Sequence, residues 1–232
     1  IADLPADFWR PTLALAIFDL DNTLLAGDSD YLWGVFLSQL GVVDGATYRR
    51  ENERFYQQYQ AGNLDIYEFL RFSLKPLSSH SLEQLDGWRR RFLEEQIDPI
   101  ILPAARRLLE QHRRAGDTLL IITATNAFVT APIAARLGVS NLIATDPEMV
   151  AGRYTGEIAG LPCFREGKVD RLDQWLKTSG NDLKGSSFYS DSHNDIPLLE
   201  RVDRPVAVDP DQALAAHAAE RGWRIISLRS EQ

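Results

Sequence analysis

Two aspartates separated by one residue follow an unbroken apolar run near the start of the chain. The run covers residues 13–18, and Asp19, Asp21 and Thr23 follow it at every second position. Such a run is typical of a strand buried on both faces, and α/β sheets bind ligands at the carboxyl ends of their strands. Neighbouring carboxylates repel each other unless a cation or a shared proton relieves the repulsion. The stretch therefore predicts a site for a hard metal ion, with a carboxyl group left for acid–base chemistry.

The same Asp-x-Asp pattern also opens a calcium-binding loop. That loop needs Gly at its sixth position and Glu at its twelfth. Counted from Asp19, those positions hold Leu24 and Asp30, so the calcium loop is excluded. A solvated turn after a strand remains as the alternative for this stretch taken alone.

Three further polar clusters stand where buried elements begin or end. Thr123 follows a second apolar run, Lys168 stands at the start of a helical pattern, and residues 190–195 follow a third apolar run. Each cluster is ordinary by itself, because Thr often caps helices and Asp-rich stretches often form turns. A Lys at a helix start opposes the helix dipole, so Lys168 gains if an anion lies nearby. The order and spacing of the four clusters favour one shared site.

The elements that would position these residues fall into two groups. Between about residue 29 and residue 103 there are helical patterns and no convincing buried strand. The predicted helices cover residues 31–40, 48–61, 66–74 and 81–96. Ser81 and Gln84 predict a capping box at the start of the last one. From residue 104 onward strands and helices alternate, as in a parallel α/β sheet.

That second part contains short apolar runs between amphipathic segments. The predicted strands are 118–122, 142–144, 186–189, 206–208 and 225–228, with helices at 104–115, 127–137 and 168–177 and a small β-excursion over 149–158. Pro132 is expected to lie near the start of its helix or to kink it.

Composition narrows the classes of function. The chain has 232 residues, a net charge of −8 and one cysteine. The negative charge argues against nucleic acid as a partner, because phosphate backbones need clustered Lys and Arg. No apolar run approaches a membrane span of about 18 residues, and the first eleven residues do not form a secretory signal. The single Cys163 suits a reducing cytoplasm and is expected to be a packed side chain rather than a nucleophile.

The four clusters together resemble the motifs of haloacid dehalogenase (HAD) superfamily phosphatases over nearly the whole chain. Residues 19–23 resemble the first motif, Thr123 with the two isoleucines before it the second, Lys168 the third, and residues 191–195 the fourth. The helical segment after the first motif is similar to the cap of one subgroup. That subgroup contains phosphoserine phosphatases and some bacterial histidinol-phosphate phosphatases.

The resemblance implies a fold and a division into domains. Residues 1–25 and 104–232 would form an α/β core, a Rossmann-like parallel sheet with helices on both faces. Residues 26–103 would form an inserted α-helical cap domain. The cap and the loops that face it would select the substrate.

The resemblance also implies a Mg²⁺-dependent phosphomonoester hydrolase that forms an aspartyl phosphate. Asp19 would be the nucleophile, and Asp21 would protonate the leaving group and then activate water. Mg²⁺ would be held by the Asp19 carboxylate, the Asp21 backbone carbonyl and Asp191. Thr123 and nearby N–H groups would hold the phosphate, and Lys168 would balance its charge.

Other residues are implied around this centre. Those expected to contact the substrate are Asn22, Thr23, Asp28, Ala124, Thr125, Asn126 and Asn194. Asn194 and Asp195 would also orient the water on the metal and Lys168. The chain departs from the family pattern where Ser190 and Ser192 replace two glycines of the fourth motif, and where Ala124 and Thr125 replace a glycine pair after the second.

The cap residues favour one substrate. Asp28 stands where phosphoserine phosphatases carry an acidic partner for the substrate ammonium. Ser73 stands where they carry an Arg for the substrate carboxylate, and Arg71, two residues earlier, faces another side of a helix. Histidinol phosphate has an ammonium and an imidazole but no carboxylate, so it is the predicted substrate, a small phosphorylated metabolite of histidine biosynthesis.

Aromatic residues of the cap, Tyr31, Trp33, Phe55 and Tyr59, either stack on this ring or pack the cap core, with packing expected for most of them. The alternatives are phosphoserine or another small phosphomonoester as substrate, a phosphotransferase that passes phosphate to an alcohol, and a non-catalytic protein that binds phosphate and metal.

Overall fold

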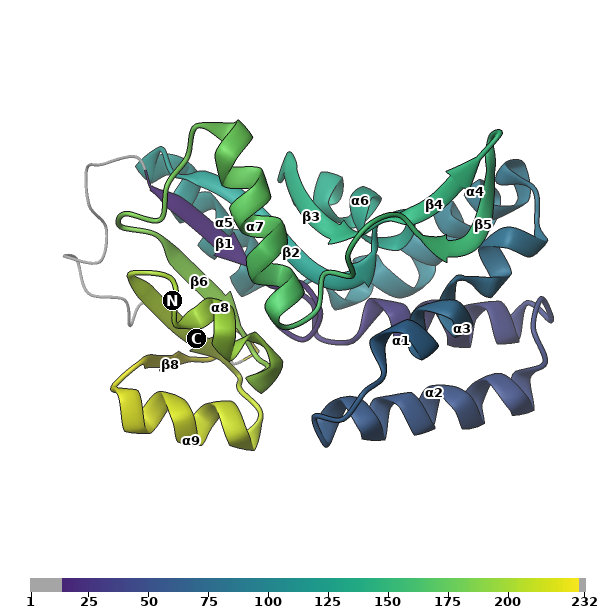
Figure 1. The fold of residues 1–232 in the computed structure, drawn as a ribbon, viewed down its shortest axis with the longest axis horizontal. Helices are drawn as coiled ribbons and strands as arrows, with labels where there is room; N and C mark the ends of the chain where they lie inside the picture. Colours follow the sequence, from purple (N-terminus) through teal and green to yellow (C-terminus); the bar gives the residue numbers. More distant parts are fainter. Residues whose placement is uncertain (1–13, 230–232) are drawn as a thin grey trace.

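A parallel sheet forms the centre of the computed structural model, which describes residues 14–229 (Figure 1). In this part of the chain, six strands pair in the order β3-β2-β1-β6-β7-β8. The strands are β1 (Leu15–Phe18), β2 (Thr118–Asn126), β3 (Asn141–Thr145), β6 (Ser187–Ser190), β7 (Arg204–Val208) and β8 (Arg224–Ile226). The order changes direction between β1 and β6, and such a switch point is where an open α/β sheet places its ligand crevice.

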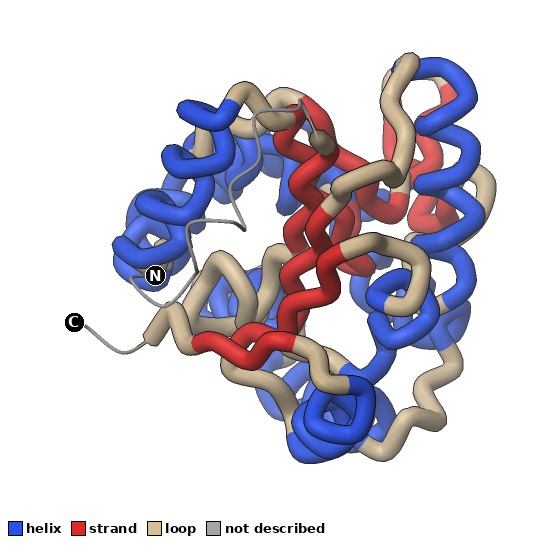
Figure 2. Tube along the Cα trace, turned by 90° about the vertical axis from the view of Figure 1, so that its left-hand side faces the viewer, coloured by secondary structure: helices blue, strands red, loops and turns tan. Residues whose placement is uncertain are grey.

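Helices cover both faces of the sheet. Ala16 and Phe18 of β1 pack with the apolar side chains of α5 (Pro103–Ala115) and α6 (Ala127–Arg136). Leu15 and Ile17 pack on the opposite face, with side chains of α7 (Glu166–Ser179), α8 (Ile196–Leu199) and α9 (Gln212–Arg221). Figure 2 shows the strands running between helices on two sides. Burial on both faces explains why β1 is apolar at every position, and the predicted α/β fold class is confirmed.

Between β1 and α5 the chain forms four α-helices, at the right of Figure 1. They are α1 (Ser29–Gln39), α2 (Gly45–Gln60), α3 (Ile66–Ser79) and α4 (Leu82–Phe92). The N-caps are Asp28, Asp44, Asp65 and Ser81, and each side chain accepts a hydrogen bond from a first-turn N–H. Such caps each stabilise a helix by about 1 kcal/mol. The capping box of Ser81 and Gln84 is present as predicted.

Aromatic packing joins this helical segment to the sheet. The Trp33 ring lies 5.1 Å from the Phe92 ring and 5.7 Å from the Phe128 ring of α6. Trp33 is 1% exposed. This residue therefore packs in the core, as expected for most of the cap aromatics.

The β-excursion is a hairpin of β4 (Pro147–Val150) and β5 (Arg153–Ile158). β5 packs against α3, and Figure 1 shows the hairpin extending toward α3 and α4. Gly156 has φ +90°, and a Cβ there would lie 3.1 Å from Ser78 Oγ. The division into a core of 1–25 and 104–232 and a cap of 26–103 stays a prediction. Residues 1–13 and 230–232 of that core lie outside the described residues.

Several boundaries differ from the sequence predictions. β2 continues to Asn126, because Asn126 pairs with Thr145 of β3. α4 ends in a π-helical turn, residues 93–97, instead of continuing as an α-helix. α9 was not predicted, since its alanine-rich sequence has little apolar periodicity. Within residues 14–229, no helix is long and apolar enough to cross a membrane.

Candidate active site

Asp19 and Lys168 form the centre of the site. Asp19 directly follows β1, and its backbone N–H donates to the carbonyl oxygen of Tyr189 in β6 at 2.9 Å. Lys168, near the start of α7, donates from Nζ to Asp19 Oδ1 at 2.7 Å and lies at 2.7 Å from Asp195 Oδ1. Asp19 is only 7% exposed and Lys168 only 3%. Two carboxylates thus hold one buried ammonium in place from either side.

Asp191 approaches Asp19 through a shared hydroxyl group. Thr23 Oγ1 lies 3.0 Å from Asp191 Oδ1 and 3.5 Å from Asp19 Oδ2. The backbone N–H of Asp191 donates to the same Oγ1 at 3.1 Å. Thr23 therefore fixes the distance between the two carboxylates, a role inside the protein that differs from the substrate contact expected from the sequence.

Asp21 is held by two donors from different parts of the chain. Its Oδ1 accepts the backbone N–H of Ser29 at 2.7 Å, and its Oδ2 accepts the hydroxyl of Thr125 at 2.8 Å. Asn22, which directly follows Asp21, has φ +57°, a left-handed conformation that Asn tolerates. Thr125 thus orients the predicted acid–base residue, and its predicted contact with the substrate stays a prediction.

The fourth motif keeps its shape through serine side chains. Ser190 Oγ donates to Asp195 Oδ2 at 2.6 Å and accepts the backbone N–H of Ser192 at 3.2 Å. Ser192 caps the short 3₁₀ helix at residues 193–195 by accepting the N–H of Asn194. Ser190 therefore supports the Asp195 carboxylate, which in turn holds Lys168, while the Ser192 hydroxyl holds Asn194.

These groups lie around one cavity of about 810 Å³. The predicted site residues on its wall are Asp19, Asp21, Asn22, Asp28, Thr123, Ala124, Thr125, Lys168, Asp191, Asn194 and Asp195. Thr23 and Asn126, expected to contact the substrate, are not among the residues that line it. Asn126 caps α6 by accepting the N–H of Val129 at 3.2 Å. Its side-chain oxygen serves the cap and its Nδ2 donates to Asp30, while its predicted contact with the substrate stays a prediction.

Burial shifts the charge balance of the site. It raises the pKa of Asp19 to about 7, although the Lys168 ammonium lowers it. Burial first, and the Asp28 carboxylate second, raise the pKa of Asp21 to about 6. Burial and the Asp19 carboxylate also raise the pKa of Asp191. Burial alone would lower the pKa of Lys168, but its two carboxylate partners raise it. A second cation beside the carboxylates would therefore relieve repulsion that Lys168 does not remove.

The residues present fit a magnesium ion. Within residues 14–229, no three or more His, Cys, Asp or Glu side chains gather to hold a metal by side chains alone. The predicted set needs only two such side chains, Asp19 and Asp191, because Mg²⁺ keeps several waters and the backbone carbonyl of Asp21 would be a third protein ligand. Both side chains offer hard oxygen donors, and they share the Thr23 hydroxyl. Carboxylate, carbonyl and water are the ligands that suit this ion.

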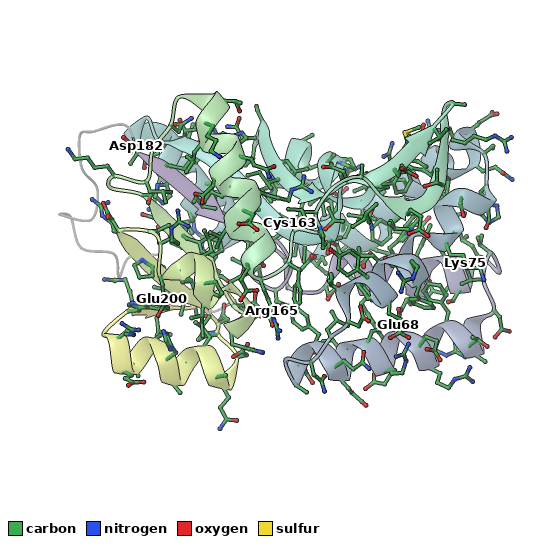
Figure 3. All side chains as sticks on the ribbon, in the orientation of Figure 1. Glu68, Lys75, Cys163, Arg165, Asp182 and Glu200 are labelled. Carbon is green, nitrogen blue, oxygen red and sulfur yellow. The ribbon has the colours of Figure 1, made fainter. Side chains whose placement is uncertain are left out.

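Two contacts that the sequence did not reveal bridge the helical segment and the sheet. Tyr59 of α2 donates its hydroxyl to Ser192 Oγ at 2.9 Å. Arg165 donates from Nε to Asn194 Oδ1 at 2.8 Å and from Nη2 to the carbonyl of Gly62. Figure 3 shows Arg165 between α7 and the helical segment. Its φ is +51°, and such strain at a non-glycine residue often marks a functional position.

The helical segment brings no cation to the cavity. Ser73 is buried, and its hydroxyl lies 3.5 Å from the carbonyl of Leu70 within its own helix. Arg71 is exposed and does not line the cavity. Among the described residues on the cavity wall, the Lys and Arg side chains are Lys168 and Arg229, both outside residues 26–103. The part of the wall formed by residues 26–103 therefore offers no Lys or Arg side chain to pair with a substrate carboxylate.

Cys163 has no part in this chemistry. Its side chain is fully buried, and burial raises the pKa of its thiol to about 12. Figure 3 shows it beneath α7. A thiol with so high a pKa carries almost no thiolate at neutral pH, so it is a packed side chain, as expected.

The fold and the site together define a class of protein: a hydrolase with an aspartate after its first strand, a lysine on a later helix and a second acidic loop at one sheet edge. A family model described as haloacid dehalogenase-like hydrolase matches residues 16–200. The chain belongs to this family. The matched range contains all four motifs, and the resemblance that they carry is confirmed.

Relatives place the chain more closely within the family. A histidinol-phosphatase from Neisseria meningitidis serogroup C is 46% identical over 219 residues, which cover 93% of this chain and 99% of that protein. A crystal structure of a protein of unknown function from Bordetella pertussis Tohama I is 47% identical, with a TM-score of 0.88, and the match covers 94% of this chain and 100% of that one. A phospho-aspartyl intermediate analogue of phosphoserine phosphatase, 17% identical with a TM-score of 0.69 over 95% of each chain, shares the fold.

Proposed function

We propose that this protein is a Mg²⁺-dependent phosphomonoesterase that hydrolyses histidinol phosphate through an aspartyl phosphate. The observation that carries the chemistry is the buried cluster of Asp19, Lys168 and Asp195, with Asp191 facing Asp19 across the Thr23 hydroxyl. When bound, Mg²⁺ would neutralise the negative charge of the nucleophile and of the phosphoryl group. A small phosphorylated metabolite of the cytoplasm is the partner that this activity implies.

The residues divide the reaction between them. An Asp19 carboxylate oxygen attacks phosphorus, the bond from phosphorus to the alkoxide breaks, and Asp21 gives its proton to the leaving oxygen. Water then attacks phosphorus while Asp21 takes a proton from it, and the bond from phosphorus to Asp19 breaks, which releases phosphate. Lys168 stays beside Asp19 throughout and balances the charge of the phosphoryl group. A pKa of about 6 suits Asp21 to both proton transfers near neutral pH.

Histidinol phosphate is supported by the walls of the cavity. Asp28 and Asp30 line the end formed by the helical segment, together with the aromatic residues Tyr31, Phe55 and Phe69. This end offers negative charge and flat apolar surface, and no Lys or Arg of residues 26–103 lines it. An ammonium with an imidazole matches such a wall, whereas the carboxylate of phosphoserine does not. The 46% identity to a histidinol-phosphatase supports the same substrate.

Steady-state phosphate release tests both parts of this proposal. We expect kcat/KM for histidinol phosphate to exceed that for phosphoserine by at least ten-fold, and activity to disappear when EDTA removes divalent ions. We expect Asp19→Asn to lower kcat by several orders of magnitude, since the amide is not a nucleophile. The matched control is Asp173→Asn, an exposed aspartate paired with Arg201 away from the cavity.

The possible results separate the alternatives. A preference for phosphoserine would show that the substrate is wrong while the chemistry stands. Full turnover by the Asp19→Asn variant would contradict the covalent intermediate. Phosphorylated product from an added alcohol would indicate the phosphotransferase, and absence of any phosphate release from phosphate esters with Mg²⁺ would indicate a non-catalytic protein.

A further inference from the structure

The cavity contains a carboxylate that the proposed reaction does not use. Asp30, in the first turn of α1, lines the cavity and accepts one hydrogen bond, from Asn126 Nδ2 at 3.3 Å. Within residues 14–229 it forms no ion pair, and its charged neighbours are the carboxylates of Asp28 and Asp21. A partly buried carboxylate among like charges is unfavourable unless a donor or a cation joins it.

A second polar group on the same wall lacks a partner. Asn52 of α2 lines the cavity and is 8% exposed. In the described part of the chain, no residue hydrogen-bonds its side-chain amide. Its amide atoms stay accessible from the cavity, so water or a ligand can hydrogen-bond to them. An amide in this position on a cavity wall is therefore a candidate ligand contact.

Packing holds this amide in place. A Cβ at Gly34 would lie 2.7 Å from Asn52 Nδ2 and 2.4 Å from Tyr48 Cε1. Gly34 thus lets α1 and α2 approach closely, with Asp30 on one helix and Asn52 on the other. On the other side, Asn126 fixes Asp30 while its own oxygen caps α6. Both groups are set by helix packing before any substrate binds, which lowers the cost of binding.

We propose that Asp30 and Asn52 bind the ring nitrogens of a heteroaromatic group at the end of the substrate remote from the phosphate. This inference rests on the proposed function and names the residues that would distinguish its substrate from other amino alcohol phosphates. Asp30 accepts a ring N–H, and the Asn52 amide, which can donate or accept, pairs with the other ring nitrogen. In the sequence, Asp28, the predicted partner of the ammonium, stands between Asp21 of the reacting centre and Asp30.

The chemistry of the pair explains discrimination as well as binding. A site with buried hydrogen-bonding groups disfavours a ligand that leaves them unpaired, by factors that can reach several orders of magnitude. A substrate without a ring leaves Asp30 and Asn52 without partners. A substrate with a carboxylate at this end meets two carboxylates, Asp28 and Asp30, and is repelled.

The test compares two substrates that share an ammonium and differ in the ring, histidinol phosphate and phosphoethanolamine. We expect wild-type enzyme to favour histidinol phosphate in kcat/KM. Asp30→Asn and Asn52→Leu should each lower the ratio of the two kcat/KM values at least ten-fold, mainly through KM for histidinol phosphate. The inhibition constant of the product histidinol should rise by a similar factor, which reports binding without catalysis.

A matched control and the contrary outcomes complete the design. The control is Glu68→Gln, since Glu68 is also an acidic residue in the first turn of a helix of this segment (Figure 3). Glu68 pairs with Arg54 and does not line the cavity. The substitution should therefore leave the ratio of the two kcat/KM values unchanged. A wild-type enzyme without preference for histidinol phosphate would contradict the proposed function itself. A wild-type preference that both variants retain, or an equal loss on both substrates, would contradict ring recognition alone.

Discussion

At the scale of single residues, the site depends on hydrogen bonds that hold each carboxylate in one orientation. Asp21 is an example, because Ser29 N–H and Thr125 Oγ1 occupy one oxygen each. Both donors stabilise the ionised carboxylate and lower its pKa, which burial raises. These opposing effects leave the pKa of Asp21 at about 6. The two donors therefore set the pKa of Asp21 as well as its orientation.

Removal of the Thr125 hydroxyl should shift this balance. In Thr125→Val the ionised form of Asp21 loses a donor, so the pKa of Asp21 rises above about 6. The limb of the pH–rate profile that belongs to Asp21 then moves to higher pH. A hydrogen bond to a charged group is worth about 1.5–3 kcal/mol, so we expect kcat/KM to fall roughly ten- to hundred-fold.

Thr130→Val is the matched control for this substitution. Thr130 is a buried threonine of α6 whose hydroxyl donates to the carbonyl of Asn126 at 3.0 Å. Its loss should affect stability and leave the pH–rate profile in place. A Thr125→Val profile that superimposes on the wild-type profile would contradict the assigned role of Thr125.

At the scale of elements, close packing of α1 on α2 sets one wall of the cavity. This contact depends on Gly34, since a Cβ there would lie 2.4 Å from Tyr48 Cε1. The Tyr48 ring is itself fixed, 4.4 Å from the Phe72 ring of α3. A helix interior glycine normally costs about 1 kcal/mol relative to alanine, so a packing requirement explains its presence.

Two Gly→Ala substitutions should therefore have opposite signs. Gly34→Ala should lower the free energy of unfolding by about 1–3 kcal/mol, because the new methyl group forces α1 from α2. Gly87→Ala, in α4, should raise it by about 0.5–1 kcal/mol, because nothing lies within 4 Å of the added Cβ. Urea unfolding of both variants measures the two effects, and a stabilised Gly34→Ala variant would show that the helices separate at little cost.

At the scale of the whole molecule, Arg165 and Tyr59 hold the helical segment over the site. Arg165 reaches both the Gly62 carbonyl of that segment and Asn194 of the acidic loop. Its φ of +51° is unfavourable for a residue with a side chain, at a cost of about 1–3 kcal/mol. Arg165 keeps this conformation as the N-cap residue of α7, with its side chain bonded to both segments.

Arg165→Met should weaken this connection. We expect KM for the substrate to rise by a larger factor than kcat falls, because the reacting residues keep their own contacts. Amide hydrogen exchange around residues 60–64 should become faster, since fewer contacts hold that turn to the sheet. Arg171→Met is the control, because Arg171 lies on the same helix and pairs with Asp146 outside the helical segment. Equal effects of the two substitutions would contradict a specific bridge.

Much of the fold and the reacting centre could be predicted from the sequence. Asp19 follows an apolar strand, and strand ends of a parallel sheet meet at one edge, so local pattern was enough to bring Asp19, Thr123 and Asp191 together. The helical segment was predicted because amphipathic periodicity and the Ser81 capping box are local signals, whereas the Asp caps of the other three helices were not recognised. α9 lacked such a signal and was missed.

The remaining features depend on contacts between residues far apart in the chain, which no local pattern encodes. Thr125 meets Asp21 across 104 positions, and Arg165 meets Gly62 across 103. The sequence does not indicate that Asn52 lines a cavity, because its position there results from the packing of α2. The sequence by itself therefore determined which residues can react, because strand ends and charge are local properties. Only the tertiary structure decided which neighbours shift the pKa of these residues and which polar groups on the cavity wall lack a partner within residues 14–229. Burial and pairing arise only when distant segments pack.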